Sequence, residues 1–313
     1  MTTTAVAHPN IALIKYWGKQ ALPGNIPATP SLSITLDTLC STTTVADATA
    51  EKVVLDGRES DDAKVSAALA MLRSEFDIGP LEIVSDNNFP TAAGLASSAS
   101  GFAALVTAID THCGLGMTDR QRSVYARRAS GSAARSIYGG IVGLAGPDWV
   151  AEPLLDAADW PLNVVIAITD VERKDVSSSA GMRTSEATSP YYEPWVRTTA
   201  EDYRHARAAV AERNFPLLAE LAESSCLKMH GVMHSSQPAM IYWRPATIAC
   251  MHAVRALRAD GADVFFTIDA GPQVKAVCLP DSLPAVAARL AEIPGVLATH
   301  SVGLGDGARI VAA

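Results

Sequence analysis

The run of small residues from Pro90 to Gly101 constrains this chain more than any other segment. It contains two glycines and three serines, and it leads into apolar residues at helical spacing: Phe102, Leu105, Val106 and Ile109. We therefore expect a loop followed by a helix. Small side chains let a phosphate approach the backbone, and the unpaired N–H groups of a helix start favour an anion. The run predicts a nucleotide phosphate-binding loop, although a tightly packed helix start without a ligand has the same composition.

Two common kinds of nucleotide-binding loop are excluded. No Gly-Lys-Ser or Gly-Lys-Thr follows the run, as a Walker loop requires, and the Gly-x-Gly-x-x-Gly pattern of dinucleotide-binding domains is absent. The net charge of −8, without a basic block, argues against nucleic-acid binding. An anionic substrate must therefore be held by a few local cations.

The bulk composition is that of a globular enzyme. The 313 residues are enough for a large core, and 49% of them are hydrophobic. No apolar run approaches the roughly 20 residues that span a bilayer, and residues 1–8 lack a signal-peptide pattern. The five cysteines include no Cys-x-x-Cys pair, so neither a zinc site nor a disulfide framework is indicated. These features predict a protein of the reducing cytoplasm that does not bind membranes.

The periodicity of apolar residues predicts an α+β chain. In the first half we expect strands at residues 31–36, 42–45, 52–55 and 81–84, and helices at residues 63–76 and 119–129. In the second half we expect strands at residues 163–168, 264–268 and 274–278, and helices at residues 194–214, 216–229 and 245–261. Because no linker rich in proline, serine or glycine separates the halves, we predict two tightly joined lobes, residues 1–160 and residues 161–313.

Two polar clusters have the composition of anion sites. An apolar, strand-like stretch after His8 ends in Lys15 and Lys19, and lysine is a compact cation that suits phosphate. Further along, hydroxyls and a glycine at residues 130–132 precede Arg135, whose planar guanidinium matches a carboxylate. The patterns alone fit these sites, but they equally fit a solvated strand end and a helix–helix contact of small residues.

Three further features are ambiguous by themselves. Asp269 stands at the end of a predicted strand before a Gly-Pro turn, where a carboxylate is either a catalytic group or part of an Asx-type turn. Residues 174–182, with hydroxyls and a glycine, are predicted as a capped loop. His230 and His234 have the spacing of metal ligands on a helix, but no third ligand is evident, so we expect a structural role.

Several segments, in the expected order, resemble the mevalonate diphosphate decarboxylases, a branch of the GHMP kinase superfamily. They are Asn-Ile-Ala-x-x-Lys-Tyr-Trp-Gly-Lys from Asn10, Pro-x3-Gly-Leu-x-Ser-Ser-Ala from Pro90, Ser-Gly-Ser-Ala-x-Arg-Ser from Ser130, Lys-x-Val-Ser-Ser-x-x-Gly-Met from Lys174 and Thr-x-Asp-Ala-Gly-Pro from Thr267. The resemblance implies a GHMP kinase fold with an N-terminal ribosomal-S5-like lobe and a C-terminal α/β sandwich lobe. It also implies a homodimer.

The resemblance implies the positions of the ligands as well. ATP would contact Pro90, Ala93, Gly94, Leu95, Ala96, Ser97, Ser98 and Ala99. The substrate would contact Tyr16, Trp17, Gly18, Lys19, Lys64, Ser130, Gly131, Ser132, Ala133, Ala134, Arg135 and Ser179. Arg135 would bind the C1 carboxylate and Lys15 would lie beside the C3 oxygen. Asp269 would be the catalytic carboxylate, which either accepts the proton of the C3 hydroxyl or orients that hydroxyl.

The implied activity is the decarboxylation of (R)-mevalonate 5-diphosphate to isopentenyl diphosphate in isoprenoid and sterol biosynthesis, with ATP and Mg²⁺. Phosphorylation of the tertiary C3 hydroxyl makes it a leaving group, which explains a kinase fold in a lyase. Gln20-Ala21, residues 26–31 and Ser179 depart from the family pattern. These departures leave a phosphomevalonate decarboxylase and a mevalonate 3-kinase as alternatives. A catalytically silent ligand sensor on the same fold is a more remote one.

Overall fold

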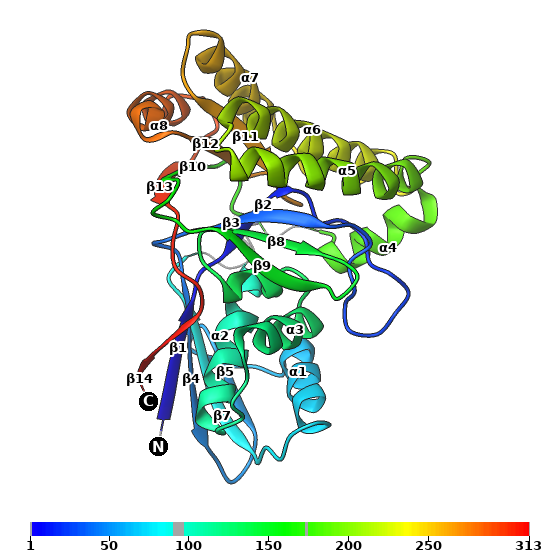
Figure 1. The fold of residues 1–313 in the computed structure, drawn as a ribbon, viewed down its shortest axis with the longest axis vertical. Coiled ribbons are helices and arrows are strands. Elements are labelled where there is room, and N and C mark those ends of the chain that lie inside the picture. Colours follow the sequence, from blue (N-terminus) through cyan, green and yellow to red (C-terminus); the bar gives the residue numbers. More distant parts are fainter. Residues whose placement is uncertain (1, 90–96, 173–174, 313) are drawn as a thin grey trace.

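The computed structural model describes residues 2–89, 97–172 and 175–312, which form three β-sheets and their covering helices (Figure 1). The first sheet has the strand order β14 (Arg309–Ala312), β1 (Thr2–Ala7), β4 (Ser41–Asp47), β7 (Leu81–Asn87), β5 (Lys52–Leu55) and β6 (Arg58–Glu59). The second has the order β2 (Asn10–Ile14), β3 (Ser31–Thr35), β8 (Ile141–Ala145) and β9 (Val150–Leu155). The third has the order β11 (Val264–Ile268), β12 (Val274–Cys278), β10 (Asn163–Ile168) and β13 (Ala298–Gly303).

Both halves of the chain contribute helices. Those of the first half are α1 (Ala63–Arg73), α2 (Ser97–His112), α3 (Asp119–Ala129) and the 3₁₀ helix η1 (Ala133–Ile137). Those of the second half are α4 (Ser178–Thr188), α5 (Tyr192–Ala211), α6 (Phe215–His234), α7 (Pro245–Ala259), the 3₁₀ helix η2 (Pro280–Ser282) and α8 (Leu283–Ala291). The side chains of Asp62, Thr118 and Ser177 cap α1, α3 and α4, because each accepts a bond from a first-turn N–H group.

The second sheet lies in the middle of the molecule, between helices from both halves (Figure 1). α5 and α6 pack against it in the upper part of the picture, and α3 contacts it in the lower part. The 3₁₀ helix η1 also contacts this sheet. One hydrophobic cluster combines Leu13 and Ile34 of this sheet with Ile166 of β10 and Phe215 of α6. The two halves therefore share a core, as tightly joined lobes require.

The end of the chain returns to the first half. β14 pairs with β1, so residues 309–312 belong to the six-stranded sheet. The division into residues 1–160 and 161–313 stays a prediction. Among the residues that the structure describes, every helix is too short or too polar to cross a membrane.

The predicted α+β class is confirmed, and most predicted elements are present with shifted ends. The helix expected at residues 63–76 ends at Arg73, and the one expected at residues 216–229 continues to His234. The capped loop expected at residues 174–182 is wrong, because Ser177 is the cap of α4. Within the small-residue run, residues 97–101 belong to α2, so the helix expected after the loop is present.

Candidate active site

A cavity of about 960 Å³ is lined by residues from both halves of the chain. It gathers most of the segments that the sequence singled out: the end of β2, the first turn of α2, the segment after α3, the first turn of α4 and the residues after β11. The predicted site residues on its wall are Lys15, Tyr16, Trp17, Lys19, Lys64, Ser97, Ser98, Ser130, Gly131, Ser132, Arg135, Ser179 and Asp269. The fold thus joins Lys15 and Asp269, which are 254 positions apart.

Some predicted site residues are not on this wall. Of the residues that the structure describes, Gly18, Ala99, Ala133 and Ala134 are buried and do not line the cavity. The following predicted residues lie outside the described part of the chain: Pro90, Ala93, Gly94, Leu95 and Ala96. The assignment of these residues to ATP or substrate stays a prediction.

Asp269, directly after β11, is held between two buried lysines. Its Oδ1 is 2.6 Å from Nζ of Lys15, and its Oδ2 is 3.1 Å from Nζ of Lys275. Lys15 and Lys275 expose 1% and 2% of their side chains, whereas Asp269 exposes 26%. Burial alone would raise the pKa of Asp269, but the two ammonium groups outweigh it and hold that pKa well below its usual range. Asp269 is therefore an anion throughout the neutral pH range.

Arg135 is a buried cation held by neutral groups. Its guanidinium donates from Nη1 to Oγ of Ser31 (2.6 Å), from Nε to Oγ of Ser33 (3.0 Å) and from Nη2 to Oδ1 of Asn10 (3.1 Å). No acidic side chain of the described residues forms an ion pair with it. Burial lowers its pKa to about 10, so it stays charged at neutral pH. A buried guanidinium without a carboxylate partner suits an anionic ligand.

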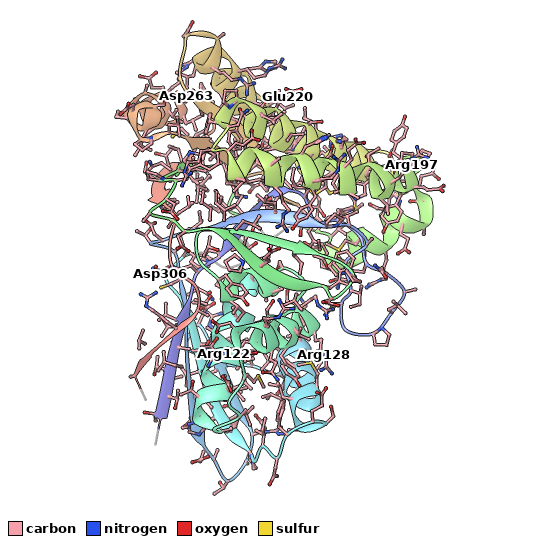
Figure 2. The ribbon with its side chains drawn as sticks, in the orientation of Figure 1. Arg122, Arg128, Arg197, Glu220, Asp263 and Asp306 are labelled. Carbon is pink, nitrogen blue, oxygen red and sulfur yellow. The ribbon has the colours of Figure 1, made fainter. Side chains whose placement is uncertain are left out.

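A second group of cations surrounds Lys19. Burial lowers the pKa of Lys19, and the nearby Lys64 and Arg183 lower it further. Nζ of Lys19 donates to Oδ1 of Asn25 (2.7 Å), and Nδ2 of Asn25 donates to the carbonyl oxygen of Arg128 (2.6 Å). These bonds attach the loop between β2 and β3 to the end of α3, where Figure 2 labels Arg128. Crowded like charges favour a multiply charged anion.

Two helix N-termini contribute to the same cavity. Ser177, Ser178 and Ser179 line it at the start of α4, and Ser97 and Ser98 line it in the first turn of α2. The N–H groups of a first turn have no partner within the helix, and the helix dipole favours an anion there. Two such ends at one cavity can bind two separate phosphate groups.

Two tyrosine hydroxyls lie against two glycines of the predicted substrate site. The hydroxyl of Tyr16 occupies the space that a side chain on Gly131 would need, and Tyr192 does the same at Gly18, where φ is +108°. Both hydroxyls are buried and have no hydrogen-bond partner among the described residues. Burial raises the pKa of Tyr16 well above its usual range and that of Tyr192 to about 12, so both remain donors. Tyr16 lines the cavity, so its hydroxyl is suited to a ligand oxygen.

Sequence reasoning missed three residues that organise the site: Asn10, Asn25 and Lys275. Nδ2 of Asn10 donates to the carbonyl oxygen of Ser132 (3.0 Å), while its Oδ1 accepts from Arg135, so Asn10 links β2 to η1. A signal for Lys275 was present, because a lysine inside an apolar strand needs a partner. No comparable signal marks Asn25, since its role depends on the path of a loop.

His230 and His234 are packed against Trp243. The ring centroids of His230 and Trp243 are 4.7 Å apart, and those of His234 and Trp243 are 4.9 Å apart. Nε2 of His230 is 3.4 Å from the carbonyl oxygen of Ile268. Burial, with a smaller contribution from Lys15, lowers the pKa of His230 to about 3. This packing agrees with the structural role expected for the pair.

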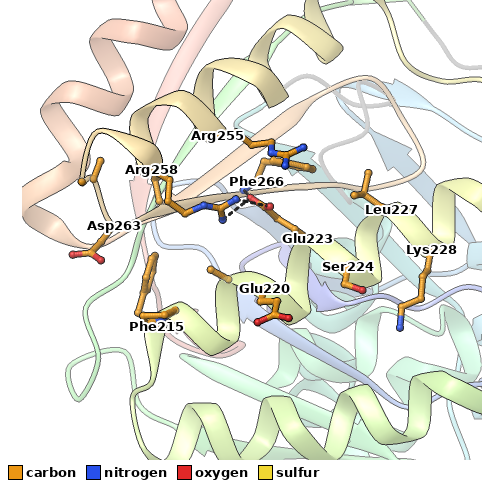
Figure 3. Close-up of a pocket in the computed structure, with 15 residues that line it drawn as sticks. Phe215, Glu220, Glu223, Ser224, Leu227, Lys228, Arg255, Arg258, Asp263 and Phe266 are labelled. Carbon is orange, nitrogen blue, oxygen red and sulfur yellow. Dashed lines mark hydrogen bonds and ion pairs between the residues drawn. The ribbon is translucent and has the colours of Figure 1, made fainter.

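A second cavity, of about 780 Å³, is lined by α6, α7 and β11 (Figure 3). Its central carboxylate is fully engaged: Glu223 accepts two bonds from Arg258, of 3.0 and 2.9 Å, and a third of 3.1 Å from the backbone N–H of Phe266. Figure 3 shows Glu223 and Arg258 pointing toward each other across this cavity. Glu223 and Arg258 are one anion and one cation, whereas Asp269 is one anion between two cations.

Comparison with known proteins gives one consistent result. Residues 7–147 match the diphosphomevalonate decarboxylase-like N-terminal domain, and residues 164–300 match the mevalonate 5-diphosphate decarboxylase C-terminal domain. Diphosphomevalonate decarboxylase mvd1 of Aspergillus fumigatus is 35% identical over 93% of this chain and 80% of its own length. The human diphosphomevalonate decarboxylase is 35% identical over 90% of this chain and 77% of its own length.

Solved structures agree with these matches. Mevalonate diphosphate decarboxylase from Enterococcus faecalis aligns with a TM-score of 0.90 and 34% identity, over 100% of this chain and 99% of its own. The enzyme from Staphylococcus aureus aligns with a TM-score of 0.91 and 33% identity, over 99% and 98%. A structure described as MDDEF in complex with MVAPP, AMPPCP and magnesium aligns with a TM-score of 0.91 and 35% identity, over 100% and 99%.

Proposed function

The chain belongs to the diphosphomevalonate decarboxylase family, and we propose that it catalyses the ATP-dependent decarboxylation of mevalonate 5-diphosphate. The products are isopentenyl diphosphate, CO₂, ADP and phosphate. The family and the GHMP kinase fold that the sequence resemblance implied are confirmed. The observation that carries the proposal is one cavity that combines an ionised carboxylate between two lysines with a buried arginine.

We assign Arg135 to the C1 carboxylate of the substrate. Its guanidinium is fixed by Ser31, Ser33 and Asn10, so little conformational entropy is lost when a carboxylate binds. The carboxylate loses its charge as CO₂ forms, so an interaction that is too strong in the ground state would slow the reaction. Partial engagement of Arg135 with three neutral acceptors moderates this interaction.

We assign Lys15 to the oxygen on C3 and to the phosphate that forms there. Its Nζ lies at the cavity wall beside Asp269, where it can neutralise the charge of the leaving phosphate. The low pKa of Asp269 supports an orienting and electrostatic role over that of a proton acceptor. Phosphoryl transfer depends mostly on positioning and charge stabilisation, and the positive charge that develops at C3 favours a fixed anion nearby.

The diphosphate is assigned to the group around Lys19. The cations Lys19 and Lys64 and the hydroxyl of Tyr16 line the cavity together with the hydroxyls that the family resemblance implies: Ser130, Ser132 and Ser179. Arg183 adds a third positive charge beside Lys19. This concentration of charge supports a diphosphate over a monophosphate. We assign the phosphates of ATP to the first turn of α2, at Ser97 and Ser98.

Mg²⁺ fits the donor groups of this cavity. It prefers oxygen ligands and keeps several of its waters, and the carboxylate of Asp175 and the hydroxyls of Ser97 and Ser98 are available on the wall. No cluster of three or more His, Cys, Asp and Glu side chains with metal-binding geometry occurs among the described residues. Mg²⁺ would thus be held by the ATP phosphates with one or two of these groups, and it would neutralise phosphate charge.

The test is an ATP-coupled assay with mevalonate, its 5-phosphate and its 5-diphosphate, in which ADP and CO₂ are measured separately. We expect both products with the diphosphate and with neither of the other compounds. Both products with the monophosphate would identify a phosphomevalonate decarboxylase. ADP without CO₂ would identify a 3-kinase, and the absence of ADP in all three reactions would identify a ligand sensor.

We further propose a homodimer in the cytoplasm. The family resemblance supports the dimer, and five free cysteines support a reducing compartment. Light scattering of the purified protein should give about twice the 32.8 kDa of one chain. A mass of one chain at micromolar concentration would contradict the dimer.

A further inference from the structure

Lys275 is a buried cation to which the proposed mechanism assigns no step of its own. It lies in β12, and the other residues of that strand are apolar and buried: Val274, Ala276, Val277 and Cys278. Burial of an ammonium group is costly unless an anion pairs with it. A valine or leucine at this position would fill the sheet without that cost, so the charge itself needs an explanation.

The pairing of two strands directs Lys275 toward Asp269. Lys275 is opposite Thr267 in the antiparallel pair of β11 and β12, and opposite residues share a face of the sheet. Asp269 is two positions beyond Thr267 and lies on the same face. Oγ1 of Thr267 donates to the carbonyl oxygen of Ala12 (3.4 Å), so this face is turned toward β2, the strand that leads to Lys15. Two strands therefore bring a lysine each to one carboxylate.

The two lysines differ in their access to the cavity. Lys15 lines it, and Lys275 is not one of the described residues that do. Nζ of Lys15 is 2.6 Å from Oδ1 of Asp269, and Nζ of Lys275 is 3.1 Å from Oδ2. Lys15 can thus leave its ion pair with Asp269 and bind a ligand phosphate, whereas Lys275 stays paired with the carboxylate of Asp269.

We propose that Lys275 is a positioning residue that acts as the permanent counter-ion of Asp269. It holds the carboxylate in place when Lys15 moves to the phosphate on C3, and the idea therefore rests on the proposed function of Lys15 and Asp269. Without Lys275, a departing Lys15 would leave a partly buried carboxylate without a paired lysine, and the carboxylate would then rotate or take up a proton. With Lys275, Asp269 remains an anion throughout the reaction.

The charged and titratable groups around Asp269 come from four elements or their ends: Lys15 after β2, Arg135 in η1, Cys226 and His230 in α6, and Lys275 in β12. Burial raises the pKa of Cys226 to about 11, lowers that of His230 to about 3 and lowers that of Arg135 to about 10. Burial also lowers the pKa of Lys275, and Asp269 opposes this effect. A new acid limb between pH 4 and pH 7 would therefore report on Asp269.

The experiment compares Lys275→Met with Lys275→Arg in the intact enzyme. Methionine keeps the apolar stem of lysine and removes the terminal ammonium group with its charge. We expect Lys275→Met to lower kcat by about 10- to 100-fold, with KM for ATP and for the diphosphate within about threefold of wild type. A new acid limb, absent from the wild-type profile, should appear between pH 4 and pH 7 in the pH profile of kcat/KM. Lys275→Arg should restore most of kcat and the wild-type profile, because it returns the charge.

Carbon-13 NMR of the Asp269 carboxyl measures the same effect directly, and its pKa should rise in Lys275→Met. Wild-type kcat, or the absence of a new acid limb together with an unchanged Asp269 pKa, would overturn the proposal. A lower melting temperature with an unchanged profile would indicate a structural role only, which also overturns it. If the methionine variant does not fold, Lys275→Gln takes its place.

A double variant separates this proposal from the proposed function. If Lys275 acts through Asp269, Asp269→Asn combined with Lys275→Met should be no slower than Asp269→Asn alone. A further loss in the double variant would show that Lys275 acts independently, against the proposal. Normal turnover of Asp269→Asn would refute the assigned role of Asp269, and the NMR measurement would then decide the role of Lys275 as its counter-ion.

Discussion

Two carboxylates interact with the same strand in different ways. Glu223 bonds to the backbone of β11 from the second cavity, and it is matched by one cation, Arg258 (Figure 3). Asp269 follows β11 at the first cavity and is matched by two lysines, with Arg135 near enough to interact electrostatically. The first group is neutral as a pair, and the second carries excess positive charge.

The difference separates structural charges from functional ones. A balanced pair satisfies itself and needs no ligand, so Glu223 and Arg258 serve to hold α6, α7 and β11 together. An unbalanced group is costly in the empty protein, and the cost is recovered when an anion binds. A chain with a net charge of −8 thus forms a local site for a substrate with a carboxylate and two phosphates.

The largest effect is expected from Asp269→Asn. The amide keeps the shape of the side chain and removes the anion that we assign to C3, so kcat should fall on the order of 10³-fold or more. ATP affinity should remain within about threefold of wild type, because the phosphate site that we assign to ATP is at Ser97 and Ser98 of α2, whereas Asp269 follows β11. CO₂ release and an ATP titration measure the two effects. Turnover close to that of wild type would remove Asp269 from the mechanism.

Arg135→Lys should have the next largest effect. Lysine keeps the charge but cannot reproduce the fork that donates to Ser31, Ser33 and Asn10. We expect kcat/KM for the diphosphate to fall by about 10²-fold, with KM for ATP nearly unchanged. Arg258→Lys is the matched control in the balanced pair, and its kcat/KM should stay within about threefold. Equal losses in both variants would mean that the excess charge has no special role.

Some of the residues in these tests could be predicted from the sequence alone. Lys15, Arg135 and Asp269 belong to short local strings, so their residue types and the family resemblance were sufficient to predict them. The start of α3 was predictable for the same reason, because Thr118 and Gln121 form a capping box within four positions.

The partners of these residues were less predictable. The role of Lys275 depends on the register of β11 and β12, and that of Asn25 depends on a loop that folds back onto α3. The contact of Tyr192 with Gly18 joins segments far apart in the chain, and β14 pairs with β1 across the whole sequence. Strand pairing and loop paths are set by packing between distant segments, which local periodicity does not contain.

Glu223→Gln should affect stability more than catalysis. Glutamine keeps one acceptor and loses the charge that binds Arg258, so the free energy of unfolding should fall by about 1–3 kcal/mol. The value of kcat should remain within about threefold, because Glu223 is in the balanced pair. Urea titration and steady-state kinetics measure the two quantities. A loss of kcat as large as that of Asp269→Asn would mean that Glu223 controls the position of β11 at the active site.

The smallest effect concerns His230, which lies beside the excess charge. Burial, and then Lys15, lowers its pKa to about 3, while in the unfolded chain it has its ordinary value near 6.5. As the pH falls below about 6.5, the unfolded state gains a proton that the folded state does not, so stability is lost. The loss should approach about 1.4 kcal/mol per pH unit between pH 6 and pH 5. Below that range the carboxylates add their own losses.

Urea titrations of His230→Gln at pH 5, 6 and 7 test this effect, with His205→Gln, at an exposed position, as the control. The pH slope should decrease in the first variant and stay unchanged in the second. Part of the slope should remain in the first variant, because burial also lowers the pKa of His234. An unchanged slope in His230→Gln would place the proton uptake elsewhere. A decreased slope would mean that the imidazole of His230 stays neutral in the folded protein, close to the positive charge of Lys15. The positive charge around Asp269 would then belong to Lys15, Arg135 and Lys275 alone, and His230 of α6 would add none.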